Sequence, residues 1–239
     1  MEKHSTYLHH GNPRLTSTVR EVVFGLEDGM VSTLGVITGI AVGTQNQFVV
    51  ILSGFVLIAV EALSMGAGSY LSSKSVKEVE ERKLAEEKEE LERYPAEEQK
   101  ELAAMYCAEG LTAPQAAKIA AEVSKHKQLL LKEMAHHELK IIPDALDEPR
   151  RNALLMGLSY IVGGLIPVAP YFFRSVLGAI PFSVVITLVG LFLVGAARTK
   201  YTAQRWWKSG LELMMVSAGA ALVGYLVAKF VEMAFGVPV

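Results

Sequence analysis

Two carboxylates and a thioether sulfur stand in stretches of sequence that carry almost no other charge: Asp28, Glu61 and Met65. A charged side chain inside a membrane-spanning helix costs about 3 kcal/mol on insertion scales, so each one needs a structural or functional reason. Carboxylate oxygens combined with one sulfur suit Fe²⁺ or a similar transition ion better than Mg²⁺ or Ca²⁺. These residues predict an ion path. The alternative is that Met65 only packs and that the acids pair with nearby bases.

The three side chains share one depth if their stretches form an antiparallel hairpin, which the four-residue connection 44–47 requires. At 1.5 Å per residue from this turn, Asp28 lies about 24 Å along the first helix, and Glu61 and Met65 lie about 21 Å and about 27 Å along the second. Glu61 and Met65 are four residues apart and therefore share a helical face. We expect them to face Asp28 across the hairpin.

The elements that must position these residues are membrane spans. A span needs roughly 20 mainly apolar residues, and the chain offers five such stretches: 22–44, 48–72, 153–170, 176–197 and 210–235. Their abundance, with 51% hydrophobic residues and a mean hydropathy of +0.32, predicts an all-α membrane protein with five transmembrane helices. Pro167 predicts that the third span bends or ends early.

Charge divides the chain sharply. Residues 74–151 contain 18 of the 25 acids and 14 of the 23 bases, which predicts a hydrophilic helical insert between the second and third spans. The basic residues place the N-terminal arm and the insert in the cytoplasm and the C-terminus on the far side. The predicted regions are an arm 1–21, a transmembrane hairpin 22–72, an insert 73–150 and the last three spans 151–239. No basic footprint for nucleic acid is present at a net charge of −2.

The insert is predicted to be helical. A charged helix runs through Arg93, and Tyr94-Pro95 ends it. Its composition is compatible with a solvated extension of the second span. A second helix reaches Glu109. Thr112, with Gln115 three residues later, predicts the N-cap of a third helical region that runs toward Ile142.

Carboxylates recur along this insert at helical spacings. Glu87 with Glu90, and Glu98 with Glu101, are pairs three residues apart on either side of Pro95, and Met134 is four residues before Glu138. Such spacing is compatible with metal binding, although charged runs are usually solvated helix faces. A further pattern, Glu133-x-x-His136, matches one half of a ferritin-like di-iron site, which needs two such motifs. The pattern leaves the roles of His136 and His137 open.

A stripe of glycines favours close helix contact in the first span. Gly35, Gly39 and Gly43 form two consecutive GxxxG steps. Asp28 lies seven residues before Gly35, hence on nearly the same face. This pattern predicts a homodimer through the first span, surrounded by membrane lipid.

Three motifs together resemble the vacuolar iron transporter family: Phe24-Gly25-Leu26-Glu27-Asp28-Gly29-Met30, Ala62 to Leu71, and Gly163-Gly164-Leu165-Ile166-Pro167. The resemblance covers nearly the whole chain. It implies a five-span dimer that exports Fe²⁺ in exchange for protons, with Mn²⁺, Co²⁺ and Zn²⁺ as further candidate ions, and it implies no enzymatic activity. It also implies that Asp28 and Met65 lie on the ion path, and that the insert binds metal through a set of six residues: Glu87, Glu90, Glu98, Glu101, Met134 and Glu138.

One position departs from the family. Plant-type members carry a further glutamate two turns before the methionine, where this chain has Leu57, and Glu61 follows one turn later. Glu61 either takes over that role or proton coupling is arranged differently. Compact loops favour a prokaryotic protein of the plasma membrane. If the chain is eukaryotic, a vacuolar-type membrane is expected instead.

Two other functions compete with transport. One is a membrane-anchored metal-binding or ferroxidase-like protein whose insert carries the chemistry. The other is a scaffold with an acidic helical arm. Neither requires acids at matched depth in the membrane, so the sequence favours transport.

Overall fold

The computed structural model describes residues 15–143, 146–202 and 204–219. Within them the chain is helical and contains no strand. The elements are α1 (Leu15–Thr44), α2 (Gln47–Arg93), α3 (Pro95–Ala108), α4 (Ala113–Val123), α5 (Lys127–His137), α6 (Pro149–Val168), the 3₁₀ helix η2 (Ala169–Phe172) and α7 (Val176–Thr202). Residues 206–219 are helical as well.

The chain divides into two compact units. The first contains Met1–Leu71 and Pro149–Val239, and the second contains Ser72–Glu148. Helix α2 belongs to both, because its residues up to Leu71 lie in the first unit and the rest lie in the second.

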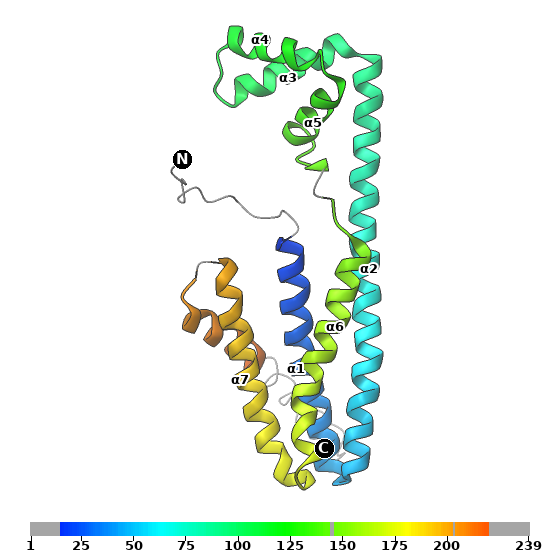
Figure 1. Cartoon of the computed structure of the whole chain (residues 1–239), viewed down its shortest axis with the longest axis vertical. Helices are drawn as coiled ribbons and strands as arrows, with labels where there is room; N and C mark the ends of the chain where they lie inside the picture. The colour runs from blue at the N-terminus through cyan, green and yellow to red at the C-terminus, as the bar shows by residue number, and fades with distance from the viewer. Residues whose placement is uncertain (1–14, 144–145, 203, 220–239) are drawn as a thin grey trace, which may run out of the picture. The chain divides into compact units, whose positions relative to one another are not determined.

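The first unit is a bundle of membrane-spanning helices, in which α1, α6 and α7 run alongside one another (Figure 1). Four helical stretches of the described residues are long and apolar enough to cross a bilayer: Leu15–Thr44, Gln47–Arg93, Pro149–Phe172 and Val176–Thr202. Large apolar side chains point outward from them, as lipid contact requires; Leu63 is 76% exposed. The all-helical membrane class is confirmed. The fifth predicted span, 210–235, lies mostly outside the described residues, so the count of five stays a prediction.

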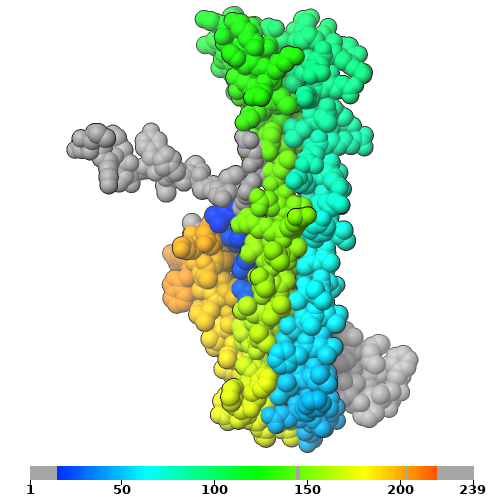
Figure 2. Space-filling view, turned by 45° about the vertical axis from the view of Figure 1, so that its right-hand side comes forward, coloured from blue at the N-terminus to red at the C-terminus, as the bar shows by residue number. Residues whose placement is uncertain are grey.

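Glycine lets the backbones of α1 and α6 approach closely. A Cβ atom built on Gly29 would lie 2.4 Å from the carbonyl oxygen of Tyr160, and one on Gly163 would lie 2.4 Å from that of Leu26. Helix α6 also touches α2, since a Cβ on Gly157 would lie 3.1 Å from the carbonyl oxygen of Ala62; Figure 2 shows α6 and α2 side by side on the surface. Helix α6 therefore contacts both helices that carry the predicted ion-path residues.

The predicted hairpin turn is confirmed at residues 45 and 46. Gln45 adopts a positive φ of 48°, and the side chain of Asn46 accepts a hydrogen bond from the backbone N–H of Val49 at 3.1 Å. Gln47 Nε2 donates to the carbonyl oxygen of Tyr171 at 2.6 Å. This bond fixes η2 beside the turn between α1 and α2, at one end of the bundle.

The second unit contains α3, α4, α5 and the end of α2. Helix α2 continues without interruption through Arg93, and the predicted break at Pro95 is confirmed. The three short helices enclose a small hydrophobic core, to which α3, α4 and α5 contribute six buried residues: Leu102, Tyr106, Ala116, Ala120, Leu130 and Met134.

One predicted element of the insert is wrong in its extent. The single helical region expected from Thr112 toward Ile142 is two helices, α4 and α5, separated by a turn at 124–126. The predicted start is confirmed, because the backbone N–H of Thr112 donates to Gln115 Oε1 at 3.1 Å. After this turn, Leu130 of α5 is buried in the same core as residues of α3 and α4, so we infer that burial of Leu130 favours the break.

Candidate ion path and acidic cluster

Asp28 on α1 and Glu61 on α2 lie close enough for their charges to interact. Both are half-buried within spans of the bundle. Met65 is half-buried too and follows Glu61 by one turn on the same face of α2. The structure thus brings the two predicted acids together across the hairpin.

A tyrosine from α6 completes this polar region. Tyr160 is fully buried, and its hydroxyl oxygen lies 2.6 Å from Ser32 Oγ. Ser32 donates its one hydrogen to the carbonyl oxygen of Asp28 at 2.6 Å, so Tyr160 is the donor to Ser32. The Tyr160 hydroxyl is also within electrostatic range of Asp28 and Glu61. Sequence reasoning missed Tyr160, because its orientation depends on how α6 packs.

Another acid of α1 is buried near the N-terminal end of the helix. Glu21 is only 3% exposed. It accepts a hydrogen bond from Ser69 Oγ of α2 at 2.8 Å and two from the guanidinium of Arg20, at 3.1 and 2.9 Å. Sequence reasoning missed Glu21, which stands one residue before the expected start of the span. Its spacing of seven residues before Asp28, hence on nearly the same helical face, is the signal that could have found it.

In the second unit, the predicted glutamates form an acidic cluster of Glu87, Glu90, Glu98, Glu101 and Glu138. Each of the five carboxylates lies close enough to others of the cluster for their negative charges to repel one another. Glu87 and Glu98 are 2% and 7% exposed, and the other three are exposed at its edge. Glu87 and Glu98 are therefore largely removed from water, although the cluster contains no base that neutralises them.

Burial and like charge hold protons on this cluster. Burial, followed by the charges of Glu138 and Glu98, raises the pKa of Glu87 to about 8. Burial and then Glu101 likewise raise the pKa values of Glu98 and Glu138 above their usual range. The Oε1 atom of Glu87 and the Oε2 atom of Glu98 are buried without a hydrogen-bond partner. Unsatisfied carboxylate oxygens of this kind are available to a cation.

Met134 occupies a different environment from these acids. Its side chain is fully buried in the hydrophobic core of the insert, beside Leu102 and Leu130. Among the described residues, no group of three or more His, Cys, Asp or Glu side chains has a geometry that could hold a metal ion. The structure therefore gathers the five predicted glutamates and places the predicted sulfur ligand in the adjacent core.

Comparison with known proteins decides the family. A model described as the VIT family matches residues 19–229. The chain belongs to the VIT family. "Vacuolar iron transporter 1" of Arabidopsis thaliana is 28% identical to it, over 97% of this chain and 94% of the relative. "Vacuolar iron transporter 1" of Tulipa gesneriana is 30% identical over 91% and 88%, and "Protein CCC1" of Saccharomyces cerevisiae is 27% identical over 91% and 69%.

Family membership and the apolar helices together make this VIT-family protein an integral membrane protein of a metal-transporting family. The relatives carry the names of transporters, which agrees with the expectation of a non-enzyme.

The ferroxidase-like alternative is not favoured. Glu133, the acid of the ferritin-like pattern, accepts a hydrogen bond from Tyr106 Oη at 2.9 Å, and its Oε2 atom lies 3.2 Å from His137 Nε2. His137 Nδ1 in turn lies 2.7 Å from Glu109 Oε1. These contacts tie α3 to α5 and leave Glu133 engaged with protein groups. In this VIT-family insert, Glu133 therefore connects α5 to α3 through Tyr106.

Proposed function

We propose that this protein moves Fe²⁺ out of the cytoplasm in exchange for protons, with Mn²⁺, Co²⁺ and Zn²⁺ as further candidate ions. The observation that carries the proposal is the approach of Asp28 and Glu61 inside the helical bundle. A carboxylate holds either a proton or a share of the charge of a cation, so the two ligands exclude one another. Met65 supplies the soft sulfur that favours transition ions over Ca²⁺. The names of the plant relatives support iron as the cargo.

Glu61 takes over the role of the acid that the family pattern places at Leu57. Leu57 and Glu61 are one turn apart on α2 and share a face. The electrostatic contact of Glu61 with Asp28 supports this substitution. Glu61→Gln should therefore weaken proton coupling more than it weakens metal uptake.

The acidic cluster of the insert collects ions on the cytoplasmic side before they enter the path. Its buried and unpartnered oxygens on Glu87 and Glu98 support a binding role. A metal ion replaces the protons that the cluster holds, because carboxylates must be ionised to act as ligands.

We also propose a homodimer through α1. Cβ atoms built on Gly35, Gly39 and Gly43 would meet nothing within 4 Å in the described part of the chain, whereas Gly25 and Gly29 of the same helix are tightly packed against α6. The exposed apolar side chains of Val36 and Val42 accompany the open glycines. A second copy of α1 would cover this stripe by close backbone contact.

The transport proposal is tested by flux in proteoliposomes that contain a pH-sensitive dye. Fe²⁺, Mn²⁺, Co²⁺, Zn²⁺ and Ca²⁺ are compared for metal uptake and for the accompanying proton movement. We expect Fe²⁺ uptake with opposite proton movement and little response to Ca²⁺. Fe²⁺ uptake without proton movement would contradict exchange, and absence of Fe²⁺ uptake would contradict transport.

The dimer proposal is tested by Gly39→Leu, with Gly68→Leu as the control. Both positions are open among the residues that the structure describes, so we expect neither leucine to disturb the packing of these residues within one copy. We expect Gly39→Leu to lower the dimer fraction in detergent, measured by light scattering, and to lower Fe²⁺ transport. A Gly39→Leu protein that is as dimeric and as active as Gly68→Leu would place the interface elsewhere.

A further inference from the structure

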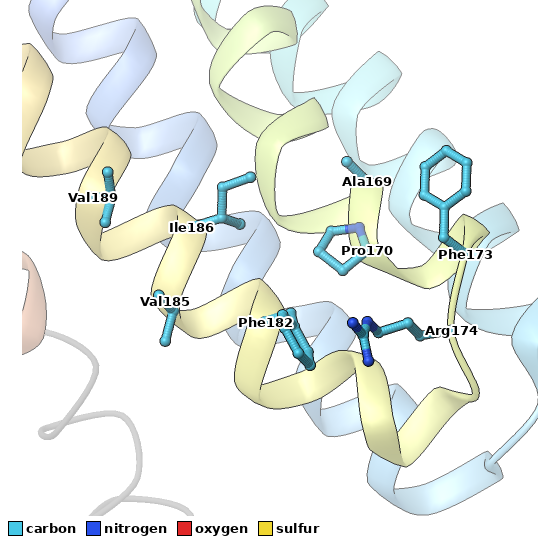
Figure 3. A pocket seen from close by; sticks show the side chains of 8 residues that line it. All are labelled: Ala169, Pro170, Phe173, Arg174, Phe182, Val185, Ile186 and Val189. Carbon is cyan, nitrogen blue, oxygen red and sulfur yellow. The ribbon is translucent and has the colours of Figure 1, made fainter.

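A hollow lies where η2 leads into α7, at the end of the bundle marked by the hairpin turn between α1 and α2. Its volume is about 510 Å³, which is within the range of small-molecule sites. Figure 3 shows the eight residues that line it: Ala169, Pro170, Phe173, Arg174, Phe182, Val185, Ile186 and Val189. Seven of them are apolar, and Arg174 stands at one edge.

The local sequence explains the hollow. Helix α6 ends at Val168 and the chain continues as the tighter η2, so small Ala169 and rigid Pro170 follow the last regular turn. On the facing helix α7, the lining residues follow a spacing of three and four from Phe182 to Val189 and therefore form one stripe. The side chains of this stripe are exposed in the described part of the molecule.

The edge of the hollow carries one positive charge. Arg174 is the only charged residue between 169 and 189. Its guanidinium lies 3.7 Å above the centre of the Phe182 ring, and no ion pair joins it to an acid within the residues that the structure describes. Stacking on the ring leaves the N–H groups at the rim of the guanidinium available to an anion.

Depth in the membrane follows from the neighbouring bond. Because Gln47 donates to Tyr171, η2 and Arg174 lie at the same end of the bundle as the hairpin turn. Helix α7 is a candidate span that begins at Val176. Arg174 therefore stands at the boundary between lipid headgroups and hydrocarbon, and the apolar stripe extends from it into the hydrocarbon.

We propose that this hollow binds a phospholipid with an anionic headgroup. One acyl chain lies along the stripe formed by Val185, Ile186 and Val189, and the headgroup phosphate is held by Arg174. Planar guanidinium groups bind phosphate through paired hydrogen bonds. A second protein copy or another segment of the chain would satisfy the apolar stripe equally well, but charge complementarity at Arg174 selects the lipid anion. The proposal is independent of the transported ion.

Native mass spectrometry of the full-length protein in detergent tests this site. The protein is incubated with phosphatidylglycerol or phosphatidylcholine of matched acyl chains, and the retained lipid is counted. One basic residue near an anionic lipid is worth about fivefold in binding, so we expect wild type to retain phosphatidylglycerol about fivefold better than phosphatidylcholine.

Three variants separate headgroup from chain. Arg174→Gln should lose the preference for phosphatidylglycerol. Lys200→Gln removes one exposed cation at the other end of α7 and should keep it. Ile186→Trp fills the hollow and should reduce retention of both lipids while Arg174 remains.

Two results would overturn the proposal. One is an Arg174→Gln protein with an unchanged lipid preference. The other is an Ile186→Trp protein that retains both lipids and loses only its oligomeric state, which would assign the hollow to a protein interface. If Ile186→Trp does not fold, the comparison of Arg174→Gln with Lys200→Gln decides the question alone.

Discussion

The bundle and the insert both gather carboxylates, but they surround them differently. In the bundle, Asp28 and Glu61 lie beside the hydroxyl groups of Ser32 and Tyr160. In the insert, Glu87 and Glu98 lie among other acids, and each has an unpartnered buried oxygen. In the bundle, Asp28 thus has both acidic neighbours, Glu27 and Glu61, and a neighbouring hydroxyl group, whereas the insert gathers five acids.

From this difference in surroundings we expect the two regions to have different functions. A path through a membrane must bind an ion weakly enough to release it, and few ligands with neutral neighbours suit that requirement. A cluster of five acids attracts cations strongly and holds protons in their absence. The comparison therefore predicts that variants in the bundle affect transport rate, and that variants in the insert affect apparent affinity and its pH dependence.

The largest effect is expected from Asp28→Asn, which keeps the size of the side chain and removes its charge. We expect loss of Fe²⁺ uptake in proteoliposomes, because the proposed path then lacks one of its two proposed acids. Met65→Ala should also reduce uptake severely by removing the only predicted sulfur ligand at that depth. Expression and elution volume should match wild type. Uptake near the wild-type rate in Asp28→Asn would show that this residue is not on the path. The predicted difference between bundle variants and insert variants would then fail.

Tyr160→Phe should have an intermediate effect. It removes the hydrogen bond to Ser32, which holds the turn of α1 after Asp28, and an ordinary hydrogen bond contributes about 1 kcal/mol. We expect a several-fold lower maximal rate of Fe²⁺ uptake with little change in apparent affinity.

The control for Tyr160→Phe is Tyr171→Phe. Tyr171 is also fully buried, but it lies in the core near the hairpin turn. Equal losses of rate in the two variants would mean that Tyr160 acts only through packing.

Much of this arrangement could be predicted from the sequence, and the exceptions have physical causes. Apolar length and charge segregation predict the described spans, and the short turn at 44–47 brings Asp28 and Glu61 to one depth. Tyr160 could not be predicted, because a tyrosine in an apolar helix can face lipid, solvent or a neighbour equally well. The break between α4 and α5 could not be predicted either, because Ser124 to His126 contains no proline or glycine and tertiary burial of Leu130 decides it.

Metal binding by the insert should depend on pH through Glu87. Because the pKa of Glu87 is raised from 4.5 to about 8, a metal must displace its proton at neutral pH. We expect Mn²⁺ affinity of the full-length protein, measured by calorimetry, to rise about tenfold per pH unit up to about pH 8 and then to level off. The stability of the metal-free insert should have the opposite pH dependence to metal affinity. The folded insert binds more protons than the unfolded chain, so it loses stability as the pH rises from 4.5 to about 8.

Glu87→Gln isolates this group, and Glu92→Gln on the same helix is the control, because Glu92 is exposed. Glu87→Gln should lower Mn²⁺ affinity and remove the step near pH 8, while Asp28→Asn should leave that step in place. A Glu87→Gln protein that keeps the step would assign the proton to another acid of the cluster.

The smallest effect is expected from Tyr106→Phe, which removes the hydrogen bond to Glu133 between α3 and α5. Burial and this hydrogen bond raise the pKa of Tyr106 to about 12, so the hydroxyl donates throughout the physiological range. Loss of one such bond costs about 1 kcal/mol, which corresponds to about fivefold faster amide hydrogen exchange in α3 and α5. Tyr94→Phe, at an exposed tyrosine, should leave exchange unchanged.

Because Tyr106 supports the insert and not the path, the maximal rate of Fe²⁺ uptake should stay within about twofold of wild type. A loss of rate as large as that of Tyr160→Phe would show that the fold of the insert controls the path directly, and the division of work between the two regions would fail.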